Sequence, residues 1–472
     1  MMSVANIIKS SGIAFGTSGA RGLVVDFTAE VCAAFALAFI EVMRERFCFS
    51  RLAIAIDNRP SSPEMALACI AAAKAAGLET DYYGVLPTPA LAVTSMADGV
   101  PAIMVTGSHI PFDRNGLKFY RPDGEITKID ELAILSAQSE LVELALNGLP
   151  QASTRAADTY MARYLDIFPS DLLAGKRIGI YEHSSSGRDL YGDLFTQLGA
   201  EVISLGRSDS FVPIDTEAVG LADIEQAQDW QREFELDALF STDGDGDRPL
   251  LSDETGTYLR GDILCLLAAQ YLSIDALAVP VSCNSAIEAC GAFKYVARTQ
   301  IGSPYVIAEF TLLQSQFGHI AGFEANGGFL LGSDIEVNGA ALSALPTRDA
   351  VLPVLAVLAM AGGEPISDLV KQLPEIYTAS DRIQNFPREQ SLAIIKRGLA
   401  EPKALLVSLG LGEFDATSVD TTDGLRMTLS NGEVVHLRPS GNAPELRCYA
   451  EASSSVRAMQ LVVQSLGALN QA

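Results

Sequence analysis

The sequence has few cationic side chains for its length. Its 472 residues include 33 lysines and arginines against 58 aspartates and glutamates, which gives a formal net charge of −25 at pH 7. Proteins that bind nucleic acids or anionic lipid surfaces usually present a basic face, so we expect neither class of partner. An anionic small-molecule substrate is not excluded, because a few arginines gathered in one cleft can reverse the charge locally.

Cysteine, histidine and long apolar runs are also scarce. The seven cysteines are odd in number, are scattered and form no C-x-x-C pair, and the four histidines show no metal-ligand spacing. This pattern favours buried thiols in a reducing compartment over a disulfide framework or a zinc site. The apolar stretches near 31–40 and 351–361 are too short to cross a bilayer, and the first ten residues lack the pattern of a secretion signal. We therefore expect a cytoplasmic protein that contacts no membrane.

The chain does contain a repeated alternation of strand and helix signals, which is the pattern of an α/β protein. Short apolar runs predict strands at 52–56, 101–105, 177–181, 201–205, 236–241 and 320–323. Helices are expected at 63–76, 187–198 and 263–272. Toward the end the pattern becomes α+β, with strands at 433–437 and 446–450 and a helix from Ser455. We expect four domains, at 1–155, 156–258, 259–372 and 373–472.

Three aspartates alternate with other residues directly after the strand expected at 236–241: Asp243, Asp245 and Asp247. Alternate residues of an extended segment share one face, so the three carboxylates can converge. A hard divalent cation relieves their repulsion, and oxygen ligands suit Mg²⁺ or Ca²⁺. A solvated acidic turn is the alternative. An EF-hand is disfavoured, because Arg248 stands where that loop requires glycine and a strand precedes the motif instead of a helix.

A second polar loop, Thr106–Pro111, follows the strand expected at 101–105 and contains Ser108 beside His109. A serine at the end of a strand, next to a histidine, can act as a nucleophile. The spacing does not match the G-x-S-x-G elbow of serine hydrolases. Taken alone, the loop fits a plain turn better than a catalytic site.

Two further loops have phosphate-binding chemistry. Residues 438–444 read Arg-Pro-Ser-Gly-Asn-Ala-Pro and are followed by Arg447, so that arginine forks, a hydroxyl, an amide and backbone N–H groups lie close in sequence. A salt-bridged turn is an equal alternative. Residues 16–22 form a glycine-rich loop with one cation, Arg21, which can wrap a phosphate or form a simple turn.

These loops, in this order and spacing, resemble the motifs of the α-D-phosphohexomutase superfamily over nearly the whole chain. Residues 15–22 resemble F-G-T-S/D-G-x-R-G, 106–111 resemble the T-A-S-H-N-P loop whose serine carries the phosphoryl group, and 243–248 resemble the D-G-D-x-D-R metal loop. Residues 322–328 lie where the sugar-binding G-E-x-S-G-H falls, and 438–444 resemble the phosphate-binding R-x-S-G-T-E-P. The resemblance implies three similar mixed α/β sheet units and a C-terminal α+β domain around a central cleft.

The resemblance also implies a role for each loop. Mg²⁺ is the implied cofactor, and its predicted ligands are the phosphorylated Ser108, Asp243, Asp245 and Asp247. The predicted catalytic residues are Ser108 as phosphoryl donor, Lys118 and His109 for proton transfer, and Arg21 and Arg248. The predicted substrate-binding residues are Thr17, Ser18, Glu324, Asn326, Arg438, Ser440, Gly441, Asn442 and Arg447.

The chain departs from the family motifs in three places. Gly107 and Ile110 replace the alanine and asparagine beside the Ser-His pair, which stays intact. In the sugar loop, Asn326 and Gly328 replace serine and histidine, so an imidazole credited with proton transfer is missing and Lys118 or His109 would have to supply that function. The phosphate loop has asparagine and alanine in place of threonine and glutamate, and the asparagine can still donate a hydrogen bond.

The implied activity is that of a phosphohexomutase. It interconverts the 1- and 6-phosphates of mannose, glucose or both through a phosphoserine and a hexose 1,6-bisphosphate, which is also the activator. Phosphoglucosamine mutase ranks lower, because the sugar loop is not G-E-Q-S-G-H. A phosphosugar phosphatase and a non-catalytic protein that binds Ca²⁺ or a sugar phosphate are further alternatives. Both a monomer and a homodimer fit the sequence.

Overall fold

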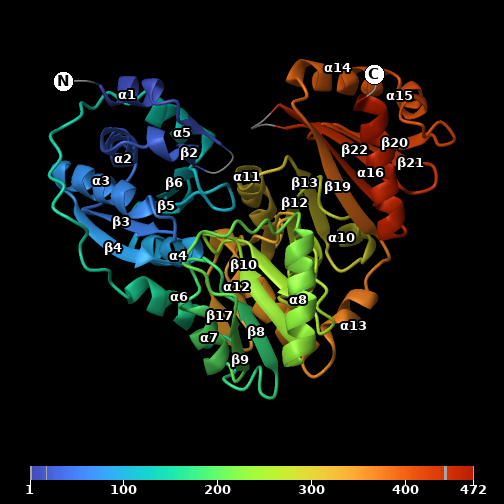
Figure 1. Ribbon diagram of the computed structural model, residues 1–472, viewed down its shortest axis with the longest axis horizontal. Helices are drawn as coiled ribbons and strands as arrows, with labels where there is room; N and C mark the ends of the chain where they lie inside the picture. Colours follow the sequence, from blue (N-terminus) through green and yellow to red (C-terminus); the bar gives the residue numbers. More distant parts are fainter. Residues whose placement is uncertain (1–2, 17–18, 441–443, 471–472) are drawn as a thin grey trace.

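The computed structural model describes residues 3–16, 19–440 and 444–470. The chain folds around four main sheets, and these define four units that hold strands β1–β7, β8–β11, β12–β18 and β19–β23. The first and fourth units lie at opposite ends of the molecule's longest axis, with the second and third between them (Figure 1). The predicted class, a mixed α/β protein with a C-terminal α+β part, is confirmed.

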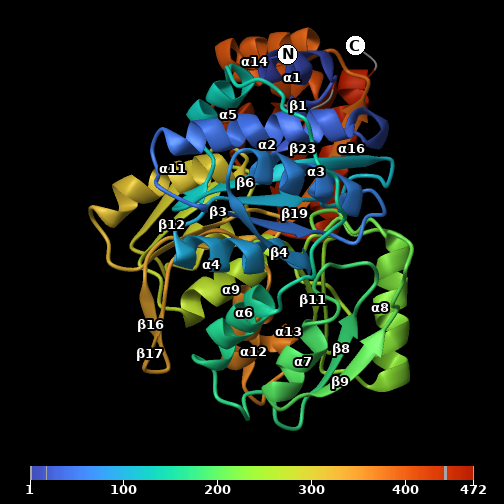
Figure 2. The same cartoon turned by 90° about the vertical axis from the view of Figure 1, so that its left-hand side faces the viewer.

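The first unit is a mixed sheet covered by helices. Its strands are β1 (Ala14–Phe15), β2 (Ala20–Leu23), β3 (Arg51–Ile56), β4 (Glu79–Val85), β5 (Ala102–Val105), β6 (Arg114–Arg121) and β7 (Gly124–Glu125). Its helices are α1 (Val4–Ser10), η1 (Val24–Asp26), α2 (Ala29–Arg44), α3 (Ser62–Ala75), α4 (Thr88–Asp98) and α5 (Lys128–Leu135). Figure 2 shows α2 and α3 side by side along this sheet.

The second and third units follow directly. The second consists of α6 (Arg155–Leu165), β8 (Arg177–Tyr181), α7 (Tyr191–Gln197), β9 (Glu201–Leu205), α8 (Leu221–Phe234), β10 (Ala238–Thr242) and β11 (Pro249–Ser252). The third consists of α9 (Gly261–Tyr271), β12 (Ala276–Pro280), α10 (Ala286–Ala289), β13 (Tyr295–Thr299), α11 (Ser303–Gln314), β14 (Ile320–Phe323), β15 (Phe329–Leu331), the ribbon β16 (Ile335–Val337) and β17 (Ala340–Leu342), β18 (Leu345–Asp349) and α12 (Val351–Ala361).

These three units share one strand topology. In the second unit, β9 and β10 both run parallel to the central β8, and β11 pairs antiparallel with β10. The third unit repeats this arrangement with β13 and β14 beside β12 and β15 beside β14, and the first repeats it with β4 and β5 beside β3 and β6 beside β5. The loops β5–β6, β10–β11 and β14–β15 are therefore structurally equivalent. Each begins at the carboxyl end of a parallel strand, where open α/β sheets bind ligands.

The fourth unit differs in both topology and core. It contains β19 (Tyr377–Gln384), α14 (Arg388–Ala400), α15 (Pro402–Ser408), β20 (Ala416–Asp420), β21 (Leu425–Leu429), β22 (Val434–Pro439), β23 (Glu445–Ala452) and α16 (Ser455–Asn470). The short helix α13 (Ile366–Lys371) precedes it and packs against the third unit. Its sheet, in the order β19-β23-β22-β21-β20, is antiparallel throughout. One apolar cluster runs through the first three units, whereas the fourth unit has a cluster of its own.

Every strand expected from the sequence is present, with ends within two residues of the expected ones. The helix expected at 187–198 begins later, at Tyr191. A Cβ on Gly187 would lie 2.0 Å from Cζ of the Tyr191 ring. The glycine therefore allows a close turn before the helix and is not part of the helix. Among the described residues, no helix combines the length and apolar character required to cross a bilayer.

One buried histidine of the fourth unit makes stability depend on pH. His436 on β22 donates through Nε2 to the carbonyl oxygen of Asp423 at 2.6 Å, and its ring stacks on Tyr449 with centroids 5.3 Å apart. Burial, with a smaller contribution from Arg426, lowers the pKa of His436 to about 4. The unfolded chain takes up this proton near the ordinary pKa of 6.5 while the folded chain does not, so stability is lost as the pH falls from 6.5 toward 4.

We predict that His436→Gln, which retains a donor but cannot titrate, removes part of this acid sensitivity. The free energy of unfolding should fall between pH 7 and pH 4.5 by roughly 2–3 kcal/mol less in the variant than in the wild type. Urea denaturation at the two pH values measures the difference. Equal pH dependence in both proteins would contradict the assignment.

Candidate functional site

The three equivalent loops meet at one place. The β5–β6 loop carries Ser108, the β10–β11 loop carries the three aspartates, and the β14–β15 loop carries Glu324. Ser108 Oγ donates to Asp243 Oδ2 at 2.7 Å, and Arg348 of the third unit bridges Asp247 and Glu324. Residues far apart in sequence thus form one buried polar cluster.

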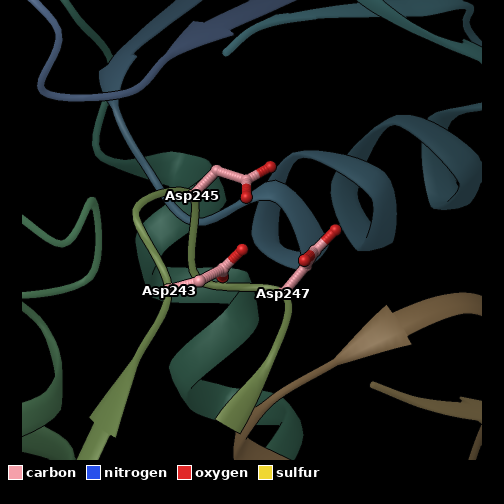
Figure 3. A group of neighbouring side chains, drawn as sticks. All are labelled: Asp243, Asp245 and Asp247. Carbon is pink, nitrogen blue, oxygen red and sulfur yellow. The ribbon is translucent and has the colours of Figure 1, made fainter. Parts of the chain in front are cut away.

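The three aspartates are fully buried and form the centre of this cluster (Figure 3). One oxygen from each of Asp243, Asp245 and Asp247 lies within 4.8 Å of the others. Gly244 between them allows this path, because a Cβ there would lie 2.7 Å from the carbonyl oxygen of Ser108. Within the described part of the chain, Asp245 Oδ1 and Asp247 Oδ1 accept no hydrogen bond although both are buried. Converging, under-satisfied carboxylate oxygens fit a hard divalent cation.

Cations from three units balance the charge of these carboxylates. Lys118 Nζ on β6 lies 2.5 Å from Asp245 Oδ2 and 2.7 Å from Asp247 Oδ2, and Arg348 Nε lies 3.1 Å from Asp247 Oδ2. Burial raises the pKa of Asp247, but Arg348, Lys118 and Arg248 outweigh it and hold that pKa below its ordinary value. Burial and the two neighbouring carboxylates instead raise the pKa of Asp243.

Ser108 is held in an uncommon backbone conformation. Its φ is 52°, in the left-handed region that non-glycine residues rarely adopt, and its side chain is buried. Its backbone N–H donates to Thr106 Oγ1 at 2.8 Å, and Thr106 Oγ1 donates in turn to Asp57 Oδ2 at 2.8 Å. Such strain persists only where the surroundings fix the loop.

Arg59, which the sequence analysis did not identify, supplies most of that fixation. Its side chain is buried against Asp57, with Nε 3.2 Å from Oδ2. Its two Nη atoms donate to the carbonyl oxygens of Ser108, Ile110, Pro111 and Arg114 at 2.5–2.9 Å. A Cβ on Gly107 would lie 2.5 Å from Arg59 Cζ, which explains why glycine suits a position where the family motif has alanine.

His109 and two arginines complete the serine side of the cluster. Arg248 Nη1 donates to His109 Nδ1 at 2.7 Å, and Ser108 Oγ lies 3.3 Å from the same nitrogen. Burial, followed by Arg248 and Arg21, lowers the pKa of His109 to about 2, so the imidazole is neutral and carries its proton on Nε2. Burial and Arg248 lower the pKa of Arg21 to about 10, which leaves it protonated at neutral pH. Two arginines whose charges act on His109, the neighbour of Ser108, thus add positive charge locally within an acidic chain.

The sugar-loop residues form a tight turn between β14 and β15. Glu324 Oε2 lies 2.9 Å from Arg348 Nη1, and Asn326 Oδ1 accepts from the Gly328 N–H at 3.0 Å. Because that oxygen is used within the loop, the amide nitrogen is the group of Asn326 that can serve a ligand. Thr216 of the second unit donates to the Asn326 carbonyl at 2.8 Å and fixes the turn from outside.

The predicted phosphate-binding residues lie on the fourth unit, where β22 and β23 pair Arg438 with Arg447. Arg438 Nε lies 2.8 Å from Asp423 Oδ2, and Arg447 Nη2 lies 3.4 Å from Glu445 Oε2. The Ser440 N–H donates to the Glu445 carbonyl at 2.8 Å. The other predicted substrate-binding residues, Thr17, Ser18, Gly441 and Asn442, lie outside the described residues.

Sequence comparison extends these observations. Family models described as phosphoglucomutase/phosphomannomutase match residues 12–141 (α/β/α domain I), 260–377 (α/β/α domain III) and 367–467 (C-terminal domain). A phosphomannomutase of Salmonella muenchen is 58% identical over 97% of this chain and 95% of its own length. A phosphomannomutase of Sinorhizobium fredii is 43% identical over 97% and 99%. A phosphoglucosamine mutase of Aliivibrio fischeri is only 28% identical over 97% and 98%.

Solved structures agree on the fold. The crystal structure of a phosphoglucomutase/phosphomannomutase family protein from Burkholderia thailandensis superposes with a TM-score of 0.74, covers 100% of this chain and 98% of its own, and is 20% identical. The matched models span most of the sequence, and the close relatives span nearly all of it. The chain therefore belongs to the phosphoglucomutase/phosphomannomutase family, within the α-D-phosphohexomutase superfamily.

Proposed function

We propose that this phosphohexomutase is a phosphomannomutase, which interconverts mannose 1-phosphate and mannose 6-phosphate and accepts glucose phosphates as further substrates. The observation that carries the proposal is the 2.7 Å contact between Ser108 Oγ and Asp243 in a buried group of three carboxylates. A hydroxyl in that position can carry a phosphoryl group next to a metal site. The preference for mannose is supported by the 58% identity to a phosphomannomutase.

The proposed reaction moves a phosphoryl group twice. Phosphorylated Ser108 gives its phosphoryl to the unphosphorylated hydroxyl of the hexose phosphate, whose proton is lost, and the serine hydroxyl is regenerated. The resulting hexose 1,6-bisphosphate reorients and returns its other phosphoryl to Ser108, which leaves the isomeric monophosphate. A trace of free 1,6-bisphosphate serves as activator by phosphorylating any enzyme that has lost its phosphoryl group.

The proposed cofactor is Mg²⁺, held by Asp243, Asp245, Asp247 and the phosphorylated Ser108. When bound, it would neutralise charge that develops on the transferring phosphoryl group. Arg21 and Arg248 add positive charge on the serine side. Because Arg248 already donates to His109 Nδ1, we assign His109 as a hydrogen-bond donor through Nε2 and Lys118 as the group that handles the hydroxyl proton.

The remaining roles follow the loops. Glu324 and Asn326 are proposed to bind sugar hydroxyls, and Thr17 and Ser18 to bind the substrate. The phosphate that is not reacting is proposed to be bound by Arg438, Ser440, Gly441, Asn442 and Arg447. The proposed domain boundaries are near residues 155, 258 and 372. All seven cysteines are free thiols, which is compatible with the proposed cytoplasmic location.

We predict that ³¹P NMR shows mannose 1-phosphate converting to mannose 6-phosphate, with no free phosphate, when Mg²⁺ and a trace of mannose 1,6-bisphosphate are present. Ser108→Ala removes the phosphoryl carrier and should lower this rate by at least about 1,000-fold. Ser136→Ala, at an exposed position, is the matched control. Release of free phosphate alone would indicate a phosphatase, and full activity of Ser108→Ala would exclude the phosphoserine route.

Removal of the metal should abolish turnover reversibly. We expect excess EDTA to lower the rate at least about 100-fold and added Mg²⁺ to restore it. Because a ligand that binds only the folded state raises stability, Mg²⁺ should also raise the melting temperature of the wild type but not of Asp245→Asn. Asp229→Asn, an exposed aspartate on α8, should respond as the wild type does. An identical Mg²⁺ response in Asp245→Asn would refute the metal assignment.

Loss of the Arg59 network should affect catalysis more than binding. Arg59→Lys keeps the charge but has at most three donors in place of five, so the Ser108 carbonyl and its neighbours lose partners. A slightly misplaced serine should lower kcat by roughly 10–100-fold with little change in KM. Arg51→Lys, at a half-buried arginine on β3, the strand before the Arg59 loop, is the control. Steady-state kinetics measure both constants. A rise in KM with unchanged kcat in Arg59→Lys would contradict the proposed role of Arg59 in positioning Ser108.

A further inference from the structure

Arg348 lies where the metal loop and the sugar loop meet. It is among the largest fully buried side chains, at 1% exposure. Its Nε lies 3.1 Å from Asp247 Oδ2, and its Nη1 lies 2.9 Å from Glu324 Oε2 and 3.0 Å from Ser303 Oγ. A guanidinium buried this deeply requires partners, and each carboxylate requires it in return. One side chain therefore couples the two loops.

The arginine follows a path that only glycine at position 328 permits. A Cβ on Gly328 would lie 2.4 Å from Arg348 Cδ and 2.5 Å from Cγ, well inside any normal contact. These are stem atoms of a side chain whose head is fixed by two carboxylates, so they cannot shift without breaking its ion pairs. Gly328 and Arg348 are thus a complementary pair. The glycine, which replaces the histidine of the family motif, leaves room for the side chain of Arg348.

The backbone of β18 around Arg348 is fixed by contacts of the residues on either side of it. Asp349, the next residue, points to the opposite face and accepts from Tyr160 and Tyr164 of α6 at 2.6–2.8 Å. Glu125 on β7 accepts from Thr347 Oγ1 at 2.6 Å and from Ser303 Oγ at 2.9 Å. Three units therefore determine where the guanidinium lies, which is what a residue that orients another group requires.

We propose that Arg348 is the positioning residue of the sugar site, and that it orients the Glu324 carboxylate toward the substrate hydroxyls in a space that Gly328 leaves open. With Oε2 bound to Arg348, Glu324 presents Oε1 as an acceptor of fixed direction. A hydroxyl of the bound sugar then donates a hydrogen bond to Oε1. A substrate that lacks this hydroxyl leaves the buried oxygen without a donor. This inference rests on the proposed role of Glu324 in binding sugar hydroxyls.

The test measures discrimination by binding and does not depend on turnover. In a Ser108→Ala background, calorimetry gives the Kd of mannose 1-phosphate and of its 3-deoxy and 4-deoxy analogues. We expect the parent protein to bind mannose 1-phosphate at least about tenfold more tightly than one of the two analogues. In Arg348→Met that ratio should fall to about one, and Arg348→Lys should restore part of it. The ratio is internal to each variant, so a reduced fraction of folded protein does not change it.

Gly328→Ala provides the reciprocal test. If it acts by displacing Arg348, it should also reduce the ratio, and Gly328→Ala combined with Arg348→Met should be no worse than either alone, as expected for coupled residues. Arg232→Met, at an exposed position on α8, should keep the parent ratio. An unchanged ratio in Arg348→Met, or additive effects in the double variant, would overturn the inference.

The same experiment separates this inference from the proposed function. If the deoxy analogues are discriminated and Arg348→Met abolishes the discrimination, the inference stands even where the wild type shows no mutase turnover by ³¹P NMR. If the wild type turns over but the ratio does not depend on Arg348, the function stands and the inference fails. Failure of the parent protein to bind any of the three sugars would overturn the inference, and absence of turnover by the wild type as well would overturn both.

Discussion

Three carboxylates buried within 4.8 Å of one another are the constraint on which the rest of this structure depends. Removing charge from water is costly, and like charges at this distance add to the cost. Each of the first three units contributes a cation in response: Lys118 from the first, Arg248 from the second and Arg348 from the third. The negative charge of the three aspartates, which suits a divalent cation, therefore also holds the three units together through these ion pairs.

The repeated strand topology explains why these groups can meet at all. In each of the first three units the chemistry lies in the loop between the third parallel strand and its antiparallel neighbour, β5–β6, β10–β11 or β14–β15. Units of one topology, packed on a shared apolar core, can bring equivalent edges together. The fourth unit, with its own core and its antiparallel sheet, carries a different kind of loop and pairs its arginines with acids of its own unit.

Much of this was predictable because the signals are local. An apolar strand that ends in alternating aspartates, or in a Ser-His pair, is visible in a few consecutive residues, and the strands themselves lie within two residues of where apolar runs placed them. Arg59 and Arg348 give no such signal. Arg59 acts on carbonyl groups some 50 positions away, and Arg348 lies within an ordinary strand. From the sequence, Gly328 indicates only that the histidine of the family motif is missing. The structure shows that the side chain of Arg348 occupies the space beside this glycine.

By itself, the sequence determined the fold class, the four-part organisation, the family and the residues proposed to carry the phosphoryl and metal chemistry, because each depends on short-range patterns of polarity and residue type. Only the tertiary structure decided how those residues are held and which of their atoms stay available. Because Arg248 donates a hydrogen bond to Nδ1 of His109, that histidine can donate only through Nε2. Arg59 fixes the strained Ser108 loop, and Arg348 forms ion pairs with both Glu324 and Asp247. The physical reason is that hydrogen bonds and burial depend on distances between residues that lie far apart in the chain, which no local pattern records.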